Sequence, residues 1–321
     1  MRRIACAILL ASAMATCQTK PIPVLFDTDI GDDIDDALAL ALALQSPELD
    51  VRAVTTVIDR TTDRTRLAWK ELALYGRRDV TLGTGSDEPF LDPVHPMRAR
   101  QFEVLTPADV APAAAGRLAA EVIVETLLNS REKITVIPVG PLTNIALALK
   151  LEPRIKQKIE RIVLMGGAFT MLYPEYNIMR DRVAAEIVFS SGVPITAVGL
   201  DVTTKCKLEG RDLERLRAAD NPASRFLYHL IELWQDGHPN QFPTLHDPLA
   251  VASVVRPHVI ETQLGSVAVE TASPLTYGIT MFTPADRVRG AATTQVARTV
   301  NVREFLDMFI ERLAAPPRKA Q

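Results

Sequence analysis

The sequence predicts an α/β protein, a single domain with a central, mostly parallel sheet flanked by helices. Short β-rich runs alternate along the chain with longer helical patterns, which is typical of strands joined by crossover helices. The chain has 321 residues, and 47% of them are hydrophobic. This composition supports a substantial core and argues against disorder. No repeat or low-complexity linker divides the chain, so we expect one domain over residues 21–321.

The predicted elements alternate from the amino end to the carboxyl end of this domain. Strands are expected at residues 24–26, 51–56, 134–139, 162–165, 195–198 and 265–269. Helices are expected at residues 35–45, 65–75, 114–129, 143–150, 184–191, 211–216, 222–236, 247–255 and 302–313. Right-handed crossovers bring the carboxyl ends of parallel strands to one edge of the sheet, where polar residues that follow the strands should meet. Residues 83–112, rich in Pro and Asp, are expected to form a loop over that edge.

Residues 1–17 have the features of an export signal. Arg2 and Arg3 precede an apolar stretch at residues 4–14, and residues 13–15 form an A-x-A-like cleavage site. The apolar stretch is too short for a permanent membrane-spanning helix. Cys17 is alternatively the lipidated residue of a bacterial lipoprotein. We therefore expect an exported, periplasmic protein, either released or lipid-anchored at Cys17.

Charge and cysteine content exclude several kinds of protein. The formal net charge is −3 and no basic stripe is evident, which argues against a nucleic-acid partner. The mixed run at residues 60–66 is interpreted as a solvated face. The mature chain keeps Cys206, with or without Cys17, which excludes a disulfide framework and a thiolate metal site. Cys206 is expected to be an inert core thiol.

Six aspartates lie at the junction between the first predicted strand and the first predicted helix: Asp27, Asp29, Asp32, Asp33, Asp35 and Asp36. Carboxylates this close repel one another unless some are protonated or a cation lies among them. Oxygen-only ligands suit a hard cation, Ca²⁺ or Mg²⁺. An EF-hand is excluded because Leu38 stands where its Glu is needed. A solvated acidic loop and a Mg²⁺-dependent phosphohydrolase remain alternatives, although no Gly-rich phosphate cradle is present.

Three other polar segments also follow predicted strands: Val-Gly-Pro-Leu-Thr-Asn at residues 139–144, residues 165–177, and Leu-His-Asp-Pro-Leu at residues 245–249. Together with the aspartate cluster they resemble the nucleoside hydrolase family, the inosine–uridine-preferring nucleoside N-ribohydrolases, over nearly the whole mature chain. The resemblance implies the nucleoside hydrolase fold with a Rossmann-like core. It also implies calcium-dependent hydrolysis of the N-glycosidic bond of purine or pyrimidine nucleosides, which releases free base and ribose. A homodimer or homotetramer is implied as well. A non-catalytic riboside-binding envelope protein with the same pocket is the alternative.

The resemblance assigns roles to individual residues. The implied Ca²⁺ ligands are Asp29, Asp36, Asp247 and the main-chain carbonyl of Val139. The implied substrate-binding residues are Asp35, Glu175, Asn177 and Asp247. Asp29 is implied to activate water, and His246 to protonate the leaving base, for which an ordinary pKa near 6.5 is suitable. Glu175 and Asn177 are expected on one face of an extended segment because they are two residues apart.

The remaining residues of the motifs have supporting or uncertain roles. Asp27 is expected to support the loop from inside, and Thr143 with Asn144 to cap a helix. Base recognition is expected from aromatic groups near the motifs: Phe169, Tyr173, Tyr176 and Trp234. The family commonly has Thr-Val-x-Gly-Asn after the second strand. This chain has Thr-Val-Ile-Asp-Arg at residues 56–60, so Asp59 or Arg60 replaces the Asn that contacts the sugar.

Overall fold

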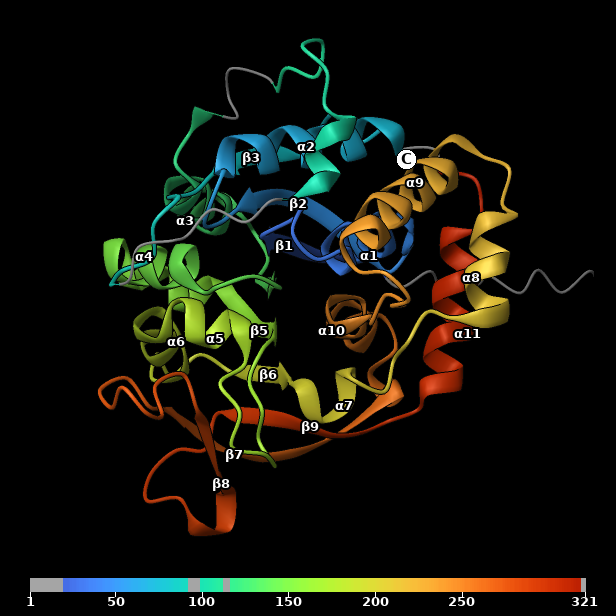
Figure 1. Ribbon diagram of the computed structural model, residues 1–321. Coiled ribbons are helices and arrows are strands. Elements are labelled where there is room, and N and C mark those ends of the chain that lie inside the picture. Colours follow the sequence, from blue (N-terminus) through green and yellow to red (C-terminus); the bar gives the residue numbers. More distant parts are fainter. Residues whose placement is uncertain (1–19, 92–98, 112–115, 319–321) are drawn as a thin grey trace, which may run out of the picture.

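A computed structural model describes residues 20–91, 99–111 and 116–318 of the chain (Figure 1). Its strands form one sheet of nine, in the spatial order β3-β2-β1-β4-β5-β6-β9-β7-β8. The strands are β1 (Ile22–Thr28), β2 (Leu49–Thr56), β3 (Thr81–Thr84), β4 (Ile134–Pro138), β5 (Ile159–Met165), β6 (Ile195–Val198), β7 (Ile260–Val269), β8 (Thr280–Pro284) and β9 (Thr294–Val300). The export signal expected at residues 1–17, with Cys17, lies outside the described residues and stays a prediction.

Helices connect the strands and cover both faces of the sheet (Figure 1). They are α1 (Asp35–Gln45), α2 (Thr61–Leu74), α3 (Ala119–Asn129), α4 (Thr143–Leu151), α5 (Tyr176–Arg180), α6 (Arg182–Phe189), α7 (Leu200–Thr203), α8 (Gly210–Arg217), α9 (Pro222–Gly237), α10 (His246–Val255) and α11 (Val302–Leu313). A short 3-10 helix, η1 (Arg100–Val104), lies between β3 and α3. In the part of the chain that the structure describes, no helix has the length and hydrophobicity needed to cross a membrane.

The observed sheet confirms the predicted α/β architecture and extends it. Every predicted strand is present, and the strands from β3 to β6, together with β9, pair in parallel. The prediction omitted β3, β8 and β9. β7 and β8 pair antiparallel at one edge, so the sheet is mostly parallel, as expected.

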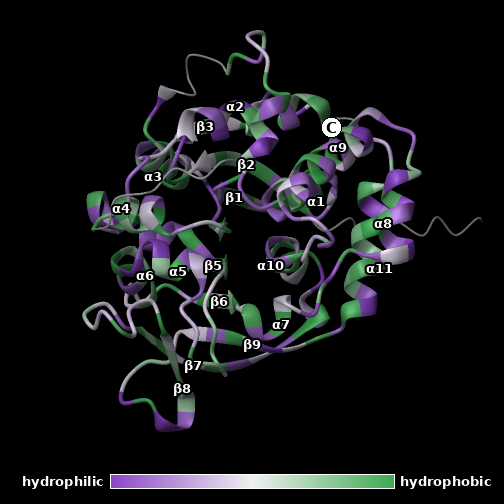
Figure 2. Cartoon of the chain, viewed as in Figure 1, coloured by the Kyte–Doolittle hydropathy of each residue, from purple (hydrophilic) through white to green (hydrophobic). Residues whose placement is uncertain are grey.

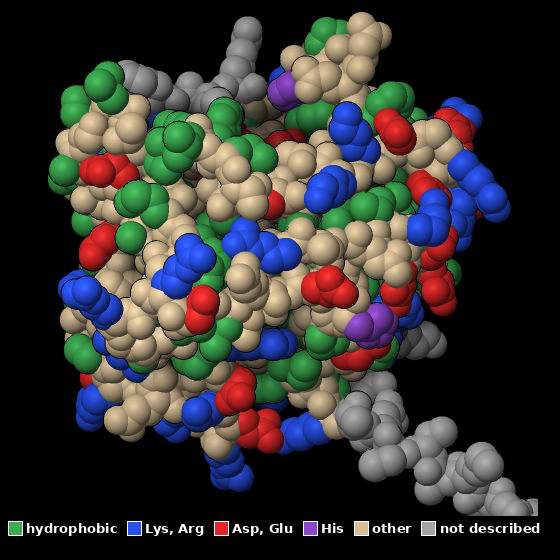
Figure 3. Space-filling view, turned by 90° about the horizontal axis from the view of Figure 1, so that it is seen from below, with side chains coloured by type: hydrophobic (Ala, Val, Ile, Leu, Met, Phe, Trp, Pro, Cys, Tyr) green, Lys and Arg blue, Asp and Glu red, His purple; other side chains and the backbone are tan. Residues whose placement is uncertain are grey.

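Two hydrophobic cores lie on opposite faces of the sheet. One core contains buried residues of α1, α2, α9, α10 and α11, and the other contains those of α3, α4 and α6. Outer helices such as α8 and α11 show both hydrophilic and hydrophobic sides (Figure 2). On the molecular face drawn in Figure 3, acidic and basic side chains are interspersed. The predicted core thiol Cys206 is buried within the first core.

Helix α1 is the central element of the larger core. All of its eleven residues are buried, because its Ala/Leu sequence is apolar on every side and strongly helix-forming. It packs against α10 and α11 and against β2. Its amino end therefore lies inside the molecule, at the point where the aspartate loop leaves β1.

Asn144 joins the ends of three parallel strands. Its amide Nδ2 donates to Asp27 Oδ1 at 2.8 Å and to the carbonyl of Thr56 at 2.9 Å. The expected helix cap by Thr143 and Asn144 is wrong: α4 has no side-chain cap, and Thr143 instead donates to Asp181 at 2.7 Å. Asn144 follows β4, so the bonds connect this strand to the ends of β1 and β2. The predicted internal support by Asp27 is confirmed, because this residue is fully buried.

We expect Asn144→Ala to lower the free energy of unfolding by about 1–3 kcal/mol, because it removes two buried hydrogen bonds, one to Asp27 and one to the Thr56 carbonyl. Urea denaturation followed by circular dichroism measures this change. Asn129→Ala, at the exposed end of α3, is the matched control and should change stability by less than about 0.5 kcal/mol. Equal effects of the two substitutions would show that the strand-joining bonds contribute little.

Candidate active site

A cavity of about 320 Å³ opens at the carboxyl edge of the central strands. It is lined by segments distant in sequence: Asp29, Asp32, Asp33, Asp35, Asp36, Val139, Met165, Tyr173, Glu175, Tyr176, Asn177, Leu200, His246 and Asp247. The site residues predicted from the sequence are thus all brought together. A larger hollow of about 700 Å³ lies beside the opposite ends of the strands. We do not regard that hollow as the active site because mostly solvated polar side chains line it.

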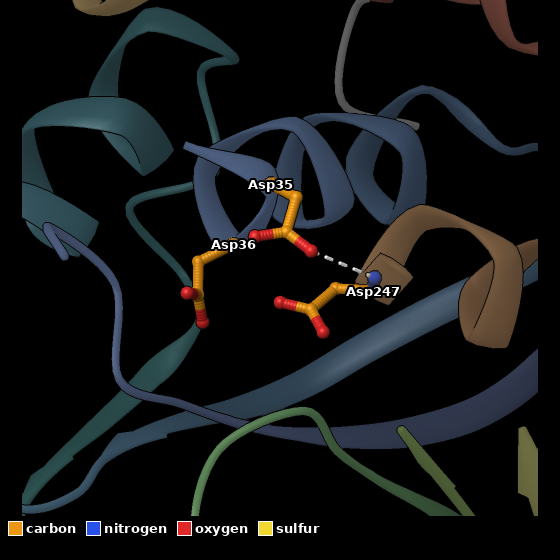
Figure 4. A group of neighbouring side chains, drawn as sticks. All are labelled: Asp35, Asp36 and Asp247. Carbon is orange, nitrogen blue, oxygen red and sulfur yellow. Dashed lines mark hydrogen bonds between the residues drawn. The ribbon is translucent and has the colours of Figure 1, made fainter. Parts of the chain in front are cut away.

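Three carboxylates form the most compact group in this cavity. Oxygens of Asp35, Asp36 and Asp247 all lie within 4.8 Å of one another, and the three residues are buried. Figure 4 shows the side chains converging from the first turns of α1 and α10. The main-chain N–H of Asp247 donates to Asp35 Oδ2 at 3.0 Å, and the Thr28 hydroxyl donates to Asp36. Two helix amino termini therefore direct their positive dipole ends at the cluster.

The cluster is too negative to be stable when fully ionised. Burial raises the pKa of Asp35, Asp36 and Asp247 well above the usual range, and the neighbouring carboxylates raise it further. Burial likewise raises the pKa of Asp29 to about 7. Carboxylates in this state either keep protons or bind a cation. Because the donors are all oxygens, the cluster matches the preference of a hard divalent ion.

The two other predicted metal ligands, Asp29 and Val139, lie on the wall of the same cavity. The Val139 carbonyl accepts a hydrogen bond from Asn177 Nδ2 at 2.6 Å, which leaves its second lone pair available. Asp29 approaches the chain after β4 closely, since a Cβ atom on Gly140 would lie 2.6 Å from Asp29 Oδ1. Glycine at this position of the Val-Gly-Pro motif therefore makes room for Asp29.

Glu175 and Asn177 line the cavity, but they lie at the start of a helix and not together on the extended segment that their spacing suggested. Glu175 is the residue that caps α5. Its carboxylate accepts main-chain hydrogen bonds from Gly167, Asn177 and Ile178 at 2.9–3.1 Å. The expectation of an extended segment is wrong because the capping hydrogen bonds of Glu175 stabilise a helix that begins at Tyr176. Burial nevertheless raises the pKa of Glu175.

His246 lines the cavity one residue before Asp247, at the start of α10. Its Nδ1 lies 2.7 Å from the Thr203 hydroxyl, which fixes the ring orientation. Burial lowers the pKa of His246 to about 4. The buried imidazole is therefore neutral near pH 7, in contrast to the ordinary pKa near 6.5 used in the sequence analysis.

Of the aromatic residues expected near the base, Tyr173 and Tyr176 line the cavity, whereas Phe169 and Trp234 do not. Trp234 stacks on His238, with 4.5 Å between the ring centroids. Met165 and Leu200 supply apolar wall that the sequence analysis did not identify. Because apolar and aromatic groups line the cavity together with a buried group of acids, it suits a ligand with a flat ring and a polyhydroxylated end.

Sequence reasoning also missed Arg64. It belongs to the run 60–66 that was interpreted as a solvated face, yet only 1% of its surface is exposed. Its guanidinium donates to the carbonyls of Asp29 and Ile30 and to the carboxylate of Asp32. A strand-end loop rich in aspartates was the available signal, because such a loop needs a buried cation nearby.

Gln101, in the expected covering loop, donates to the carbonyls of residues 32 and 33 at 3.1 and 2.8 Å.

Comparisons with known proteins agree with this geometry. The chain is 36% identical over 310 residues to the pyrimidine-specific ribonucleoside hydrolase RihA of Citrobacter koseri, covering 91% of this chain and 98% of that protein. Its structure resembles the plant nucleoside hydrolase PpNRh1, with a TM-score of 0.82, 30% identity, and coverage of 92% of this chain and 100% of that one. A purine-preferring ribonucleoside hydrolase from Gardnerella vaginalis gives a TM-score of 0.81 with 30% identity, covering 93% and 100% of the two chains.

The sequence profile described as inosine-uridine preferring nucleoside hydrolase matches residues 24–307. This match spans every segment that lines the cavity, from the aspartate loop to the amino end of α10. Its members are metal-dependent enzymes that cleave N-glycosyl bonds of ribonucleosides, and the buried carboxylates are suitable for such a metal. With its fold, its acidic cavity and its sequence in agreement, the chain belongs to the nucleoside hydrolase family.

Proposed function

We propose that the protein hydrolyses the N-glycosidic bond of nucleosides with the help of Ca²⁺, and releases free base and ribose. The observation that carries this proposal is the buried cluster of Asp35, Asp36 and Asp247 at the floor of the cavity. Neither a riboside-binding protein without activity nor a phosphohydrolase has comparable support, because the chain belongs to a family of ribonucleoside hydrolases.

Calcium is favoured by the number and kind of oxygen donors around the cluster. Asp36, Asp247 and Asp29 would supply carboxylates, and Val139 its main-chain carbonyl, as the family resemblance implies. Ca²⁺ takes six to eight oxygen ligands in flexible geometry, whereas Mg²⁺ demands a compact octahedron. When bound, the ion would supply positive charge that stabilises the ionised carboxylates and makes a neighbouring water more acidic.

Other roles in the reaction belong to side chains that contact the sugar, the attacking water or the base. Asp29 accepts a proton from the attacking water, a role suited to a carboxylate whose pKa is raised to about 7. Asp35, Glu175, Asn177 and Asp247 hold the ribose hydroxyls, and the negative charges of the three carboxylates stabilise the oxocarbenium-like sugar. His246 faces the departing base as a hydrogen-bond donor or, after taking up a proton with the substrate, as an acid.

The named relatives differ in the base that they prefer. We therefore propose that the substrate is a nucleoside, with either a purine or a pyrimidine base. One relative is pyrimidine-specific and another is purine-preferring. Met165, Leu200, Tyr173 and Tyr176 line the cavity, and their apolar and aromatic surfaces are compatible with either ring. The homodimer or homotetramer implied by the resemblance stays a prediction.

Asp29→Asn should lower kcat for nucleoside hydrolysis by about 10²–10⁴-fold, since it removes the proton acceptor. Release of base and ribose from a panel of purine and pyrimidine nucleosides, with and without a calcium chelator, measures this. Asp63→Asn, in the first turn of α2 and outside the cavity, is the matched control and should retain activity. Turnover that persists in metal-free protein would remove calcium from the proposal, and phosphate-ester cleavage without nucleoside cleavage would favour the phosphohydrolase.

His246→Ala should lower kcat by about 10²-fold for natural nucleosides, because their bases leave poorly without a hydrogen bond or a proton. A riboside with a p-nitrophenolate leaving group needs no such help and should be affected much less. Comparing the two substrates in one steady-state assay isolates the contribution to the leaving group. His258→Ala, at an exposed position, serves as the control. An equal loss on both substrates would assign His246 to sugar binding or folding.

The metal-free protein should be more stable at pH 5.5 than at pH 8. The raised pKa values mean that Asp29, Asp35, Asp36 and Asp247 hold protons more tightly folded than unfolded. This stability is complete below their ordinary pKa near 4. It is lost as pH rises through about 7 for Asp29 and through the raised pKa values of the other three carboxyls. Thermal melting with a chelator or with Ca²⁺ tests the expectation.

Calcium should therefore raise the melting temperature by several degrees at pH 8, corresponding to about 2.7 kcal/mol at a hundredfold excess over the dissociation constant. The increase should be smaller at pH 5.5, where protons compete for the same oxygens. A parallel titration with Mg²⁺ tests the choice of ion. An identical calcium effect at both pH values would mean that the ion binds away from these carboxylates.

A further inference from the structure

We infer that Asp32 binds a sugar hydroxyl of the substrate, and that Arg64 is the positioning residue that holds Asp32 in the cavity wall. The inference rests on the proposed function, in that the ligand is taken to be a riboside. It begins from one ion pair: Arg64 Nη2 lies 2.9 Å from Asp32 Oδ2, and both side chains are at least nine-tenths buried.

Arg64 is held from two sides. Its Nε donates to the carbonyls of Ile58 and Asp59, each at 2.7 Å. Its Nη1 donates to the carbonyls of Asp29 and Ile30, the latter at 3.0 Å. The guanidinium thus joins the loop after β1 to the loop after β2. Because every nitrogen already donates to the protein and Arg64 does not line the cavity, its role toward a ligand is indirect.

The loop after β2 is turned away from the cavity by the same contacts. Ile58, Asp59 and Arg60 all have positive φ, between 49° and 51°, a left-handed conformation that is unfavourable for L-residues. The turn directs the carbonyls of residues 58 and 59 at Arg64. Neither Asp59 nor Arg60 lines the cavity, and Arg60 instead pairs with Asp63 and covers the Phe102 ring. Asp32, which Arg64 holds, does line the cavity.

Asp32 differs from the other carboxylates of the cavity in its charge balance. Among the described carboxylates that line the cavity, Asp32 is the one that forms an ion pair with a basic side chain. It lies outside the compact cluster of Asp35, Asp36 and Asp247. A carboxylate already neutralised by a guanidinium has less need of a metal ion. It remains a strong hydrogen-bond acceptor for a neutral donor.

One oxygen of Asp32 is available for such a donor. Arg64 engages Oδ2, and in the described part of the chain Oδ1 has no hydrogen-bond partner. A carboxylate accepts but does not donate, so its ligand must carry an O–H or N–H group. Arg64 donates both to the main-chain carbonyl of Asp29 and to the carboxylate of Asp32, and both aspartates line the cavity, which places Asp32 beside the proposed water-activating residue. A sugar hydroxyl is the donor expected there.

Binding of methyl β-D-ribofuranoside, which has no base and is not a nucleoside, tests the contact independently of turnover. Titration calorimetry with the calcium-loaded protein compares wild type with Asp32→Asn, in which the amide oxygen still faces Arg64 and an NH₂ group faces the cavity. We expect the affinity to fall about tenfold or more. The matched control Asp63→Asn should bind as wild type does. Riboside analogues lacking the 2-, 3- or 5-hydroxyl identify the group, because one of them should bind wild type and Asp32→Asn equally.

Arg64→Lys tests the positioning role, since a lysine cannot reproduce the forked contacts to both loops. We expect weaker riboside binding, a raised KM, and little further effect of Asp32→Asn in the Arg64→Lys background. If Asp32→Asn and Arg64→Lys weaken riboside binding by independent, additive amounts, Arg64 would have only a structural role. Arg66→Lys, on the same helix and outside the cavity, is the control, and thermal melting identifies any variant that fails to fold.

The outcomes separate this inference from the proposed function. Wild-type affinity in Asp32→Asn overturns the inference, even if the protein hydrolyses nucleosides. Loss of calcium affinity in that variant, measured by calcium titration, also overturns it, because Asp32 would then act through the metal. Riboside binding that depends on Asp32 in a protein without turnover supports the inference and removes the proposed function. A wild type that neither binds the riboside nor hydrolyses nucleosides removes both.

Discussion

The concentration of negative charge inside the molecule is the constraint on which the site depends. Seven carboxylates line one cavity: Asp29, Asp32, Asp33, Asp35, Asp36, Glu175 and Asp247. A buried charge is stable only when it is paired or hydrogen-bonded, and this chain uses several forms of compensation. The amino ends of α1, α5 and α10 face the carboxylates, Arg64 pairs with Asp32, and the compact cluster at the floor is left for protons or a cation.

The parallel sheet makes this concentration possible. The parallel strands end at the same edge, and residues that are more than two hundred positions apart, such as Asp35 and Asp247, meet there through one hydrogen bond. The helices α1 and α10 begin at this edge, and their dipoles are therefore oriented toward the acids. Buried packing of α1 against α10 fixes the distance between the two amino ends.

Much of this arrangement could be predicted from the sequence, because most of the informative residues follow strands directly. The aspartate loop, Val139, Glu175 and Asn177 were placed at one edge by the alternation of strands and helices, and the family resemblance named their roles. The expectation that His246 and Asp247 also follow a strand is wrong, because they begin α10 and the helix α9 precedes them. Features that depend on tertiary contacts could not be predicted. The burial of Arg64 is decided by carbonyls in two separate loops, and the charged run around it is indistinguishable from a surface helix. The strands β3, β8 and β9 were omitted because their short or polar sequences become strands through pairing with neighbours.

The distance in sequence between the two halves of the acidic cluster has a consequence for the order of folding. Asp35 and Asp36 are synthesised early, whereas Asp247 lies near the carboxyl end, so about three-quarters of the chain emerges before the cluster can close. Non-local contacts of this kind form slowly because a long loop must be ordered first. A chain shortened before α10 would retain the early carboxylates while lacking both Asp247 and the helix end that faces them.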